Sequence, residues 1–192
     1  MSEVLKVVVV SGGLAKPSRT LVLVRALADA LASARPVQTR VIELSSIGAR
    51  LGAVLQRAAL PDDLEEHVRA IETADVLIVG SPVFRASYTG LFKHLFDLVH
   101  HESLTDVPVL LAATGGSERH ALMIDHQLRP LFSFFQARTL APTVYASEAD
   151  FRDYAIVNPA LRERISRTIA RIAPQLAPRD PHAAAQRATL AA

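Results

Sequence analysis

The chain has 192 residues, half of them hydrophobic, which is enough for one domain with a sizeable core. It carries 21 lysines and arginines and 19 acidic residues, and the basic residues are spread along the chain, which argues against a nucleic-acid-binding face. It has no cysteine, so disulfides, thiolate metal sites and cysteine nucleophiles are excluded, and any redox chemistry must come from a cofactor.

The apolar runs of this sequence are short. The run that ends at Val10 is too short for a secretory signal, and no run approaches the roughly 18 to 20 apolar residues that cross a bilayer. We therefore expect a cytoplasmic protein with no membrane partner.

Short apolar runs alternate with longer amphipathic stretches, which is the pattern of parallel strands joined by crossover helices. Five strands are predicted, at Leu5–Val10, Gln38–Glu43, Val76–Gly80, Pro108–Ala113 and Thr139–Val144. The helices that follow them are predicted at Thr20–Ser33, Asp62–Thr73, Tyr88–His100, Glu118–Phe135 and Pro159–Ala173. The long connection from Leu44 to Pro61 leaves room for a short extra helix around Ala53–Ala59.

Five such units predict an α/β fold, a doubly wound sheet of five parallel strands in the order 2-1-3-4-5 with helices on both faces. Ligands of such sheets bind beyond the carboxyl ends of the strands, at the switch point between the first and third strands. We expect residues 1–173 to form this domain and residues 174–192, which are rich in alanine and proline, to form a C-terminal tail.

The loop after the first strand predicts an anion site. It combines Gly12 and Gly13 with Ser18, Arg19 and Thr20 at a helix start, where free N–H groups and the positive end of the helix dipole favour an anion. The spacing matches neither the nucleoside triphosphate loop nor the dinucleotide loop, which leaves a terminal phosphomonoester. A simple helix cap with a glycine turn fits the same residues.

Two more loops follow the third and fourth strands. In the first, Ser81 and Pro82 set an extended backbone before Phe84 and Arg85, where a planar ring has room beside the chain, although core packing also explains Phe84. The second loop, Thr114–Ser117, joins glycines to hydroxyls, so a ligand can approach the backbone closely. The fold brings all three loops to one crevice.

Other chemistries find little support. His94, His100 and His101 have only Asp97 nearby as a possible carboxylate ligand, so we expect no metal. No serine lies in the G-x-S-x-G elbow of a hydrolase.

Two stretches carry a resemblance to a known family. Residues 81–93, S-P-V-F-R-A-S-Y-T-G-L-F-K, and residues 113–116, A-T-G-G, resemble the two flavin-ring loops of the NAD(P)H-dependent FMN reductases. The likeness covers about residues 5–172 and is greatest to the reductases of two-component alkanesulfonate, methanesulfonate and sulfone monooxygenases. It implies a flavodoxin-like fold, with FMN and NADH or NADPH as cofactors.

Hydride can pass directly from nicotinamide to flavin, and since the protein needs to supply only position, electrostatics and exclusion of water, we expect no catalytic side chain. The resemblance implies that reduced FMN then leaves for a separate flavin-dependent monooxygenase. The implied phosphate contacts are Ser11, Ser18, Arg19 and Thr20. The implied ring contacts are Ser81, Pro82, Val83, Phe84 and Arg85, with Thr114, Gly115 and Gly116 on the other edge. This chain departs from the family at Phe84, often a tyrosine, and at Ser11-Gly12, usually Gly-Ser.

The resemblance also implies a homo-oligomer, a dimer or tetramer, and one inserted residue in the fourth helix, which forces a π-bulge at the tetramer interface. Residues 123–130, M-I-D-H-Q-L-R-P, align His126 with that position, usually a tyrosine. An ordinary helix face fits His126 too. The apolar run Leu131–Phe135 exceeds what one buried helix face needs and favours a homo-oligomer.

Two alternatives stay open. One is a quinone or azo reductase that retains its FMN. The other is a non-enzymatic flavodoxin-type electron carrier, which the near-neutral charge of +2 disfavours because such carriers are usually strongly acidic.

Overall fold

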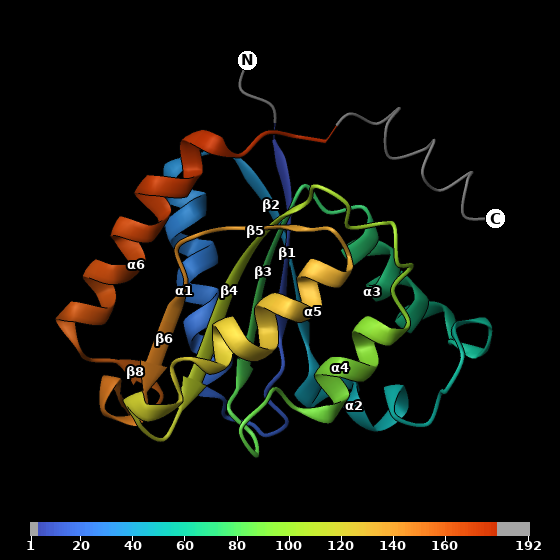
Figure 1. Cartoon of the computed structure of the whole chain (residues 1–192), viewed down its shortest axis with the longest axis horizontal. Helices are drawn as coiled ribbons and strands as arrows, with labels where there is room; N and C mark the ends of the chain where they lie inside the picture. The colour runs from blue at the N-terminus through green and yellow to red at the C-terminus, as the bar shows by residue number, and fades with distance from the viewer. Residues whose placement is uncertain (1–3, 180–192) are drawn as a thin grey trace.

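A parallel sheet forms the middle layer of the computed structural model, which describes residues 4–179 (Figure 1). Its strands are β1 (Leu5–Ser11), β2 (Val37–Glu43), β3 (Val76–Pro82), β4 (Pro108–Gly115), β5 (Arg138–Thr139) and β6 (Val144–Ser147). The order is β2-β1-β3-β4-β5, and β6 also pairs with β4. The predicted fold class and strand order are confirmed.

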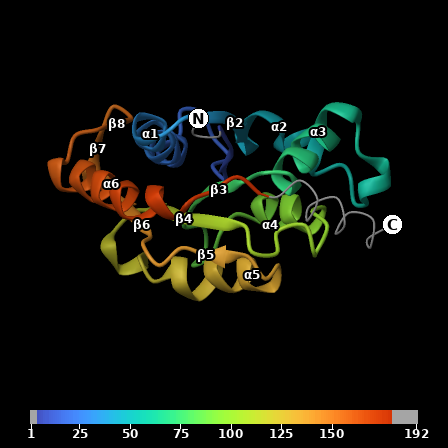
Figure 2. The ribbon, with the colours of Figure 1, turned by 90° about the horizontal axis from the view of Figure 1, so that it is seen from above.

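Helices cover both faces of this sheet. They are α1 (Arg19–Ala34), α2 (Leu44–Leu51), α3 (Asp62–Glu72), α4 (Gly90–Asp97), α5 (Arg129–Phe134) and α6 (Pro159–Ile172). Val7 and Val9 of β1 belong to the core under α1 and α6, and Val8 and Val10 belong to the core under α2 to α5. Because side chains alternate across a strand, this continuous apolar run requires a helix layer on each side. Figure 2 shows α1 and α5 on opposite sides of the sheet.

The connection after β2 differs from the prediction. The extra helix expected around Ala53–Ala59 is wrong. The α-helix of this connection is α2, which begins directly after β2 and ends at Leu51, and only a 3-10 turn occurs at Arg57–Ala59. Leu44 and Leu51 are both buried and seven residues apart, so they share one helix face. Arg57 instead binds the carboxylates of Glu65 and Glu72, which fixes its segment as an ion-paired turn.

The fifth strand is also different. The single strand predicted at Thr139–Val144 is divided into β5 and β6, both parallel to β4. Pro142 lies in the gap, and since proline has no N–H it cannot donate to a ladder. As a result, the carboxyl end of this edge strand lies at Ser147, three residues beyond the predicted end.

The predicted helix Tyr88–His100 is shortened to α4. At its start, the N–H of Thr89 donates to Ser81 Oγ at 3.2 Å, and beyond its end the N–H of His100 donates to a Glu72 carboxylate oxygen at 2.8 Å. The Glu72 carboxylate thereby accepts an N–H that a longer helix would donate to its own carbonyl four residues earlier, whereas Ser81 Oγ accepts one of the first-turn N–H groups that no helix satisfies by itself.

The predicted helix Glu118–Phe135 is divided into a 3-10 turn at Glu118–His120, a π-helix at Ile124–Leu128 and α5. The N–H of Arg129 donates to the carbonyl of Ile124, five residues earlier. Pro130 has no N–H for an α-helical bond to the carbonyl of His126. The π-helix expected at His126 is confirmed.

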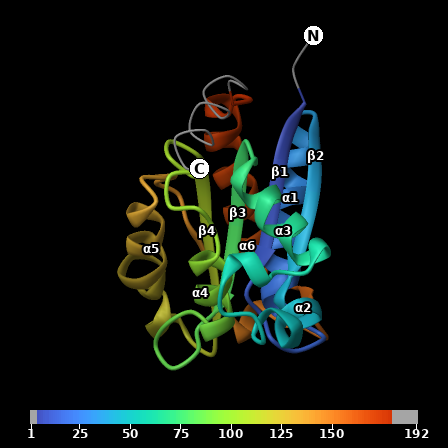
Figure 3. The ribbon, with the colours of Figure 1, turned by 90° about the vertical axis from the view of Figure 1, so that its right-hand side faces the viewer.

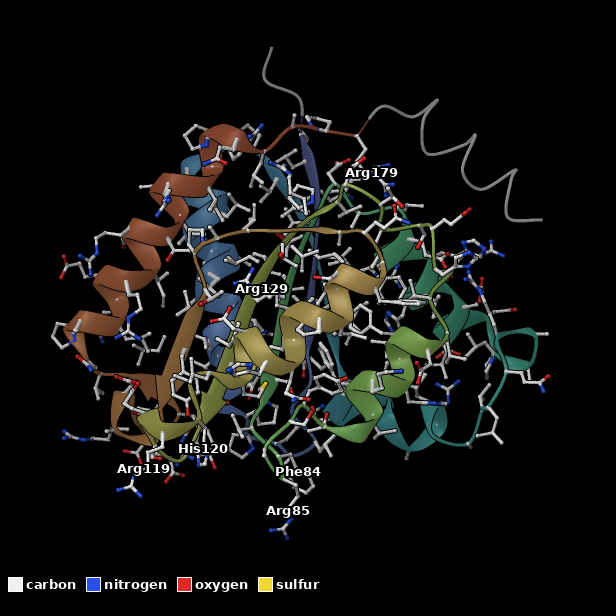
Figure 4. All side chains as sticks on the ribbon, viewed as in Figure 1. Phe84, Arg85, Arg119, His120, Arg129 and Arg179 are labelled. Carbon is white, nitrogen blue, oxygen red and sulfur yellow. The ribbon has the colours of Figure 1, made fainter. Side chains whose placement is uncertain are left out.

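The first residues of the predicted C-terminal tail are packed against the domain. Ala173–Gln175 forms a 3-10 turn, and Leu176 is buried. The N–H of Arg179 donates to Asp75 Oδ1 at 2.8 Å, and its guanidinium donates to the carbonyl of Glu72 at 2.9 Å (Figure 4). Residues 180–192 of the predicted tail lie outside the described residues. Within residues 4–179, no helix is long and apolar enough to cross a membrane.

Candidate functional site

The loops after β1, β3, β4 and β6 meet at the carboxyl edge of the sheet, the lower edge in Figure 3, and line a cavity of about 280 Å³. This is the edge that the fold predicts for a ligand. Of the predicted site residues, the structure brings Ser18, Arg19, Thr20, Pro82, Val83, Thr114, Gly115 and Gly116 to the cavity wall.

The N-terminus of α1 forms one wall of this cavity. Ser18 caps the helix, and its Oγ accepts the N–H of Leu21 at 3.2 Å, so its own hydroxyl hydrogen can donate elsewhere. Thr20 Oγ1 lies 2.6 Å from Thr114 Oγ1, and both residues are buried. The first turn of α1 contains no acidic residue, so the positive end of its dipole is not neutralised from within the helix.

Two glycines allow α1 to approach so closely. A Cβ atom at Gly80 would overlap Val24 of α1, and a Cβ atom at Gly13 would overlap Ser18 Oγ. Gly80 therefore lets α1 pack tightly over β3, and Gly13 leaves room for the cap.

The loop after β3 is tied to β4 at its base and exposed at its tip. The N–H of Val83 donates to the carbonyl of Thr114 at 2.7 Å. Phe84 and Ser87 then exchange two backbone hydrogen bonds across Arg85 and Ala86, which have φ angles of 51° and 67°. Phe84 is 55% exposed, and Figure 4 shows Phe84 and Arg85 pointing away from the body. Neither predicted ring contact lines the cavity.

Ser11 and Ser81 are buried behind the cavity and do not line it. Ser81 Oγ donates to the carbonyl of Pro82 at 3.0 Å and accepts the N–H of Thr89. The Thr89 hydroxyl in turn donates to the carbonyl of Gly12 at 2.9 Å. Ser81 therefore holds the two ends of the loop after β3 together, and Thr89 ties that loop to the loop after β1.

The loop after β6 supplies residues that sequence reasoning missed. Arg19 Nη1 lies 2.5 Å from Glu148 Oε1, and the Arg19 guanidinium lies 5.6 Å from the centre of the Tyr154 ring. The available signal was the rule that every strand of such a sheet ends at the ligand edge. The sequence prediction placed the site only in the loops after the first, third and fourth strands, so Glu148 and Tyr154 were not among the predicted contacts.

Asp150 holds this loop in shape. It is buried, and one carboxylate oxygen accepts the N–H of Ser147 at 2.7 Å while the other accepts Asn158 Nδ2 at 2.6 Å. The short hairpin of β7 (Phe151–Arg152) and β8 (Ala155–Ile156) follows, and its turn residues Asp153 and Tyr154 have φ angles of 48° and 61°. An aromatic residue in this left-handed region is uncommon, and here the turn puts Tyr154 at the cavity.

A tyrosine supports the loop after β4. Tyr145 Oη donates to the carbonyl of Ser117 at 2.6 Å. Burial raises the pKa of Tyr145, and the carboxylates of Glu118 and Asp150 raise it further. The phenol therefore stays protonated at neutral pH and keeps this hydrogen bond.

The π-helix is connected to the loop after β3. Ser87 Oγ donates to Gln127 Oε1 at 3.1 Å, and the neighbouring His126 is exposed.

Among the histidines considered as metal ligands, the His94 ring lies 2.7 Å from the carbonyl oxygen of Val54. In the part of the chain that the structure describes, no three His, Cys, Asp or Glu residues are grouped as a metal site.

Comparison with known proteins identifies the family. A family model described as NADPH-dependent FMN reductase matches residues 5–151. The chain belongs to this family. The resemblance seen in the ring loops is thereby confirmed, and the fold around the cavity is the fold of a family of flavin oxidoreductases.

Two relatives are each 58% identical over 174 residues, which is 91% of this chain. One, from Pseudomonas fluorescens, is named NADH-dependent FMN reductase SfnF and is covered to 93%; the other, from Pseudomonas aeruginosa, is named FMN reductase (NADPH) and is covered to 94%. The solved apo form of an NADH:FMN oxidoreductase named EMOB has a TM-score of 0.81 at 28% identity, covering 92% of this chain and 91% of that one.

Gly115 tests the packing at the cavity wall. A Cβ atom there would overlap the Tyr145 hydroxyl, so Gly115→Ala should destabilise the fold by about 1–3 kcal/mol, the usual cost of overpacking. Gly116→Ala is the matched control, because a Cβ there meets nothing within 4 Å. Denaturant unfolding measures both. Equal stability of the two variants, or an equal cost of Gly115→Ala in a Tyr145→Phe background, would contradict the assignment.

Proposed function

We propose that this chain reduces FMN with NADH or NADPH in the cytoplasm and releases the reduced flavin to a separate flavin-dependent monooxygenase. The observation that carries the proposal is the donor set at the start of α1, where Ser18, Arg19 and Thr20 line one wall of the cavity. Family membership and the names of two relatives of nearly equal length support the reaction.

The cavity wall fits a phosphomonoester by its chemistry. It combines the positive end of a 16-residue helix, an arginine and two hydroxyls, all of which favour an anion without a metal. Gly115 and Gly116 also line the cavity, and without side chains they leave backbone accessible where a flat ring can approach. These residues would hold FMN by its phosphate and by one edge of its ring.

The bound flavin would supply the redox chemistry by accepting a hydride from the nicotinamide. The chain would contribute binding and orientation: the start of α1 would hold the phosphate, and Pro82, Val83 and Thr114 would hold the ring. We assign no side chain as general acid or base.

We also propose that the chain forms a homo-oligomer, a dimer or tetramer, through the surface near α5. Leu122 and Phe134 are 63% and 68% exposed there, on either side of the π-helix. Large apolar side chains exposed on one segment favour contact with a second copy.

Turnover with free flavin tests the main proposal. Protein stripped of flavin should oxidise NADH or NADPH only after FMN is added, with a rate that saturates in FMN, and anaerobic filtration should recover reduced FMN in the filtrate. An FMN that stays with the protein through many turnovers would instead indicate a quinone or azo reductase.

Arg19→Ala tests the phosphate site. Loss of a charge-assisted hydrogen bond should weaken FMN by about 1.5–3 kcal/mol, while riboflavin, which has no phosphate, should bind as before. Flavin fluorescence titration measures both affinities. Arg167→Ala, which removes an exposed arginine of α6, is the control for net charge. If Arg19→Ala leaves FMN affinity unchanged, the phosphate is bound elsewhere.

Deletion of His126 tests a role for the π-helix in flavin release. The deletion should restore α-helical register and, through the Gln127–Ser87 contact, shift the loop after β3, so that FMN binds more tightly and turnover of free FMN falls. His126→Ala keeps the chain length and should leave both properties near the parent values. A deletion variant that turns over free FMN as fast as the parent would rule out this role.

A further inference from the structure

The cavity wall carries one internal ion pair. Among the lining residues within 4–179, Arg19 is the one basic side chain and Glu148 the one acidic side chain, and they bind each other at 2.5 Å. The cation best placed for a phosphate is therefore already held by a carboxylate of the same chain, 129 residues away in sequence.

The backbone at Glu148 is held in place by hydrogen bonds within its own turn. It begins the 3-10 turn at Glu148–Asp150, which is closed by reciprocal bonds between Ser147 and the buried Asp150. The ring of Tyr154, in its left-handed turn, lies with its centre 5.6 Å from the Arg19 guanidinium. Glu148 and Tyr154, both from the loop after β6, therefore contact the Arg19 guanidinium and fix its position.

This ion pair is weak enough to exchange. The side chains of Arg19 and Glu148 are 41% and 58% exposed, and exposed pairs contribute at most about 1 kcal/mol. A phosphate dianion carries about twice the charge of a carboxylate and binds arginine with two parallel hydrogen bonds, so it can displace Glu148.

We infer that Glu148 is a positioning residue that competes with the flavin phosphate for Arg19 and thereby keeps FMN exchangeable. This inference rests on the proposed function. When FMN binds, its phosphate replaces the Glu148 carboxylate as the partner of Arg19. The displaced carboxylate stays at the cavity wall and repels the phosphate. On release, Glu148 pairs with Arg19 again, so the guanidinium is never left without a counter-charge.

Glu148→Gln tests the inference, because it keeps the size of the side chain and removes its charge. FMN should bind about three- to tenfold more tightly, and reduced FMN should dissociate more slowly by a similar factor, as expected for removal of one charge near a dianion at the protein surface. Riboflavin affinity should change by less than about twofold, because without a phosphate there is no charge for Glu148 to repel.

Glu163→Gln is the matched control. Glu163 is exposed on α6 and pairs with Arg167, so this variant makes the same charge change away from the cavity and should leave FMN affinity unchanged. Raising the salt concentration should narrow the difference between the parent and Glu148→Gln, since screening weakens a repulsion between charges.

The FMN affinities of Arg19→Ala and Glu148→Gln together distinguish a failure of this inference from a failure of the proposed function. If Arg19→Ala weakens FMN while Glu148→Gln leaves its affinity unchanged, the competition is wrong and the phosphate site stands. If Arg19→Ala has no effect on FMN, the phosphate site itself is wrong. Equal tightening of riboflavin and FMN by Glu148→Gln would mean a change in loop shape and would overturn the inference.

Discussion

Parallel pairing of three strands brings Ser11 of β1, Gly80 of β3 and Ala112 of β4 level with one another across the sheet. Every loop of the cavity begins within a few residues of this line. The pairing holds because the strands are apolar on both faces and can be buried only between two layers of helices. Gly80 adds a second condition, since without a side chain it lets α1 descend until Thr20 meets Thr114. The start of α1 and the end of β4 are thereby joined at the cavity wall.

The charges at this edge are balanced across distant parts of the chain. The start of α1 contributes a dipole and Arg19, and the opposing carboxylate comes from the loop after β6. Such an arrangement favours an anion that binds and leaves over one held permanently. For a protein that handles flavin as a substrate, moderate affinity is part of the activity, because a reductase that held reduced FMN tightly would deprive its acceptor.

The sequence predicts correctly those features that depend on interactions between residues close together in the chain. The apolar run Val7–Val10 predicts β1, and the cap and cation at Ser18 and Arg19 predict the anion wall, because strand burial and helix capping act between neighbouring residues. The family resemblance, and not any periodicity, predicts the π-helix at His126. Glu148 could not be predicted because its partner is distant in sequence, and the exposure of Phe84 depends on the conformation of a turn that the sequence pattern does not specify. The α2 helix was missed because eight residues give only two full turns of pattern.

One carboxylate at the opposite edge of the sheet holds both ends of the described chain. Asp75 accepts the N–H of Lys6 at 2.7 Å through one oxygen and the N–H of Arg179 at 2.8 Å through the other. Both ends of the fold therefore leave from the side that faces away from the cavity (Figure 1). A circular permutant that joins these ends with a short linker and opens the chain near the 83% exposed Leu55 would keep the sheet order and the cavity unchanged. The position of the chain ends in this fold is therefore independent of the geometry of the cavity.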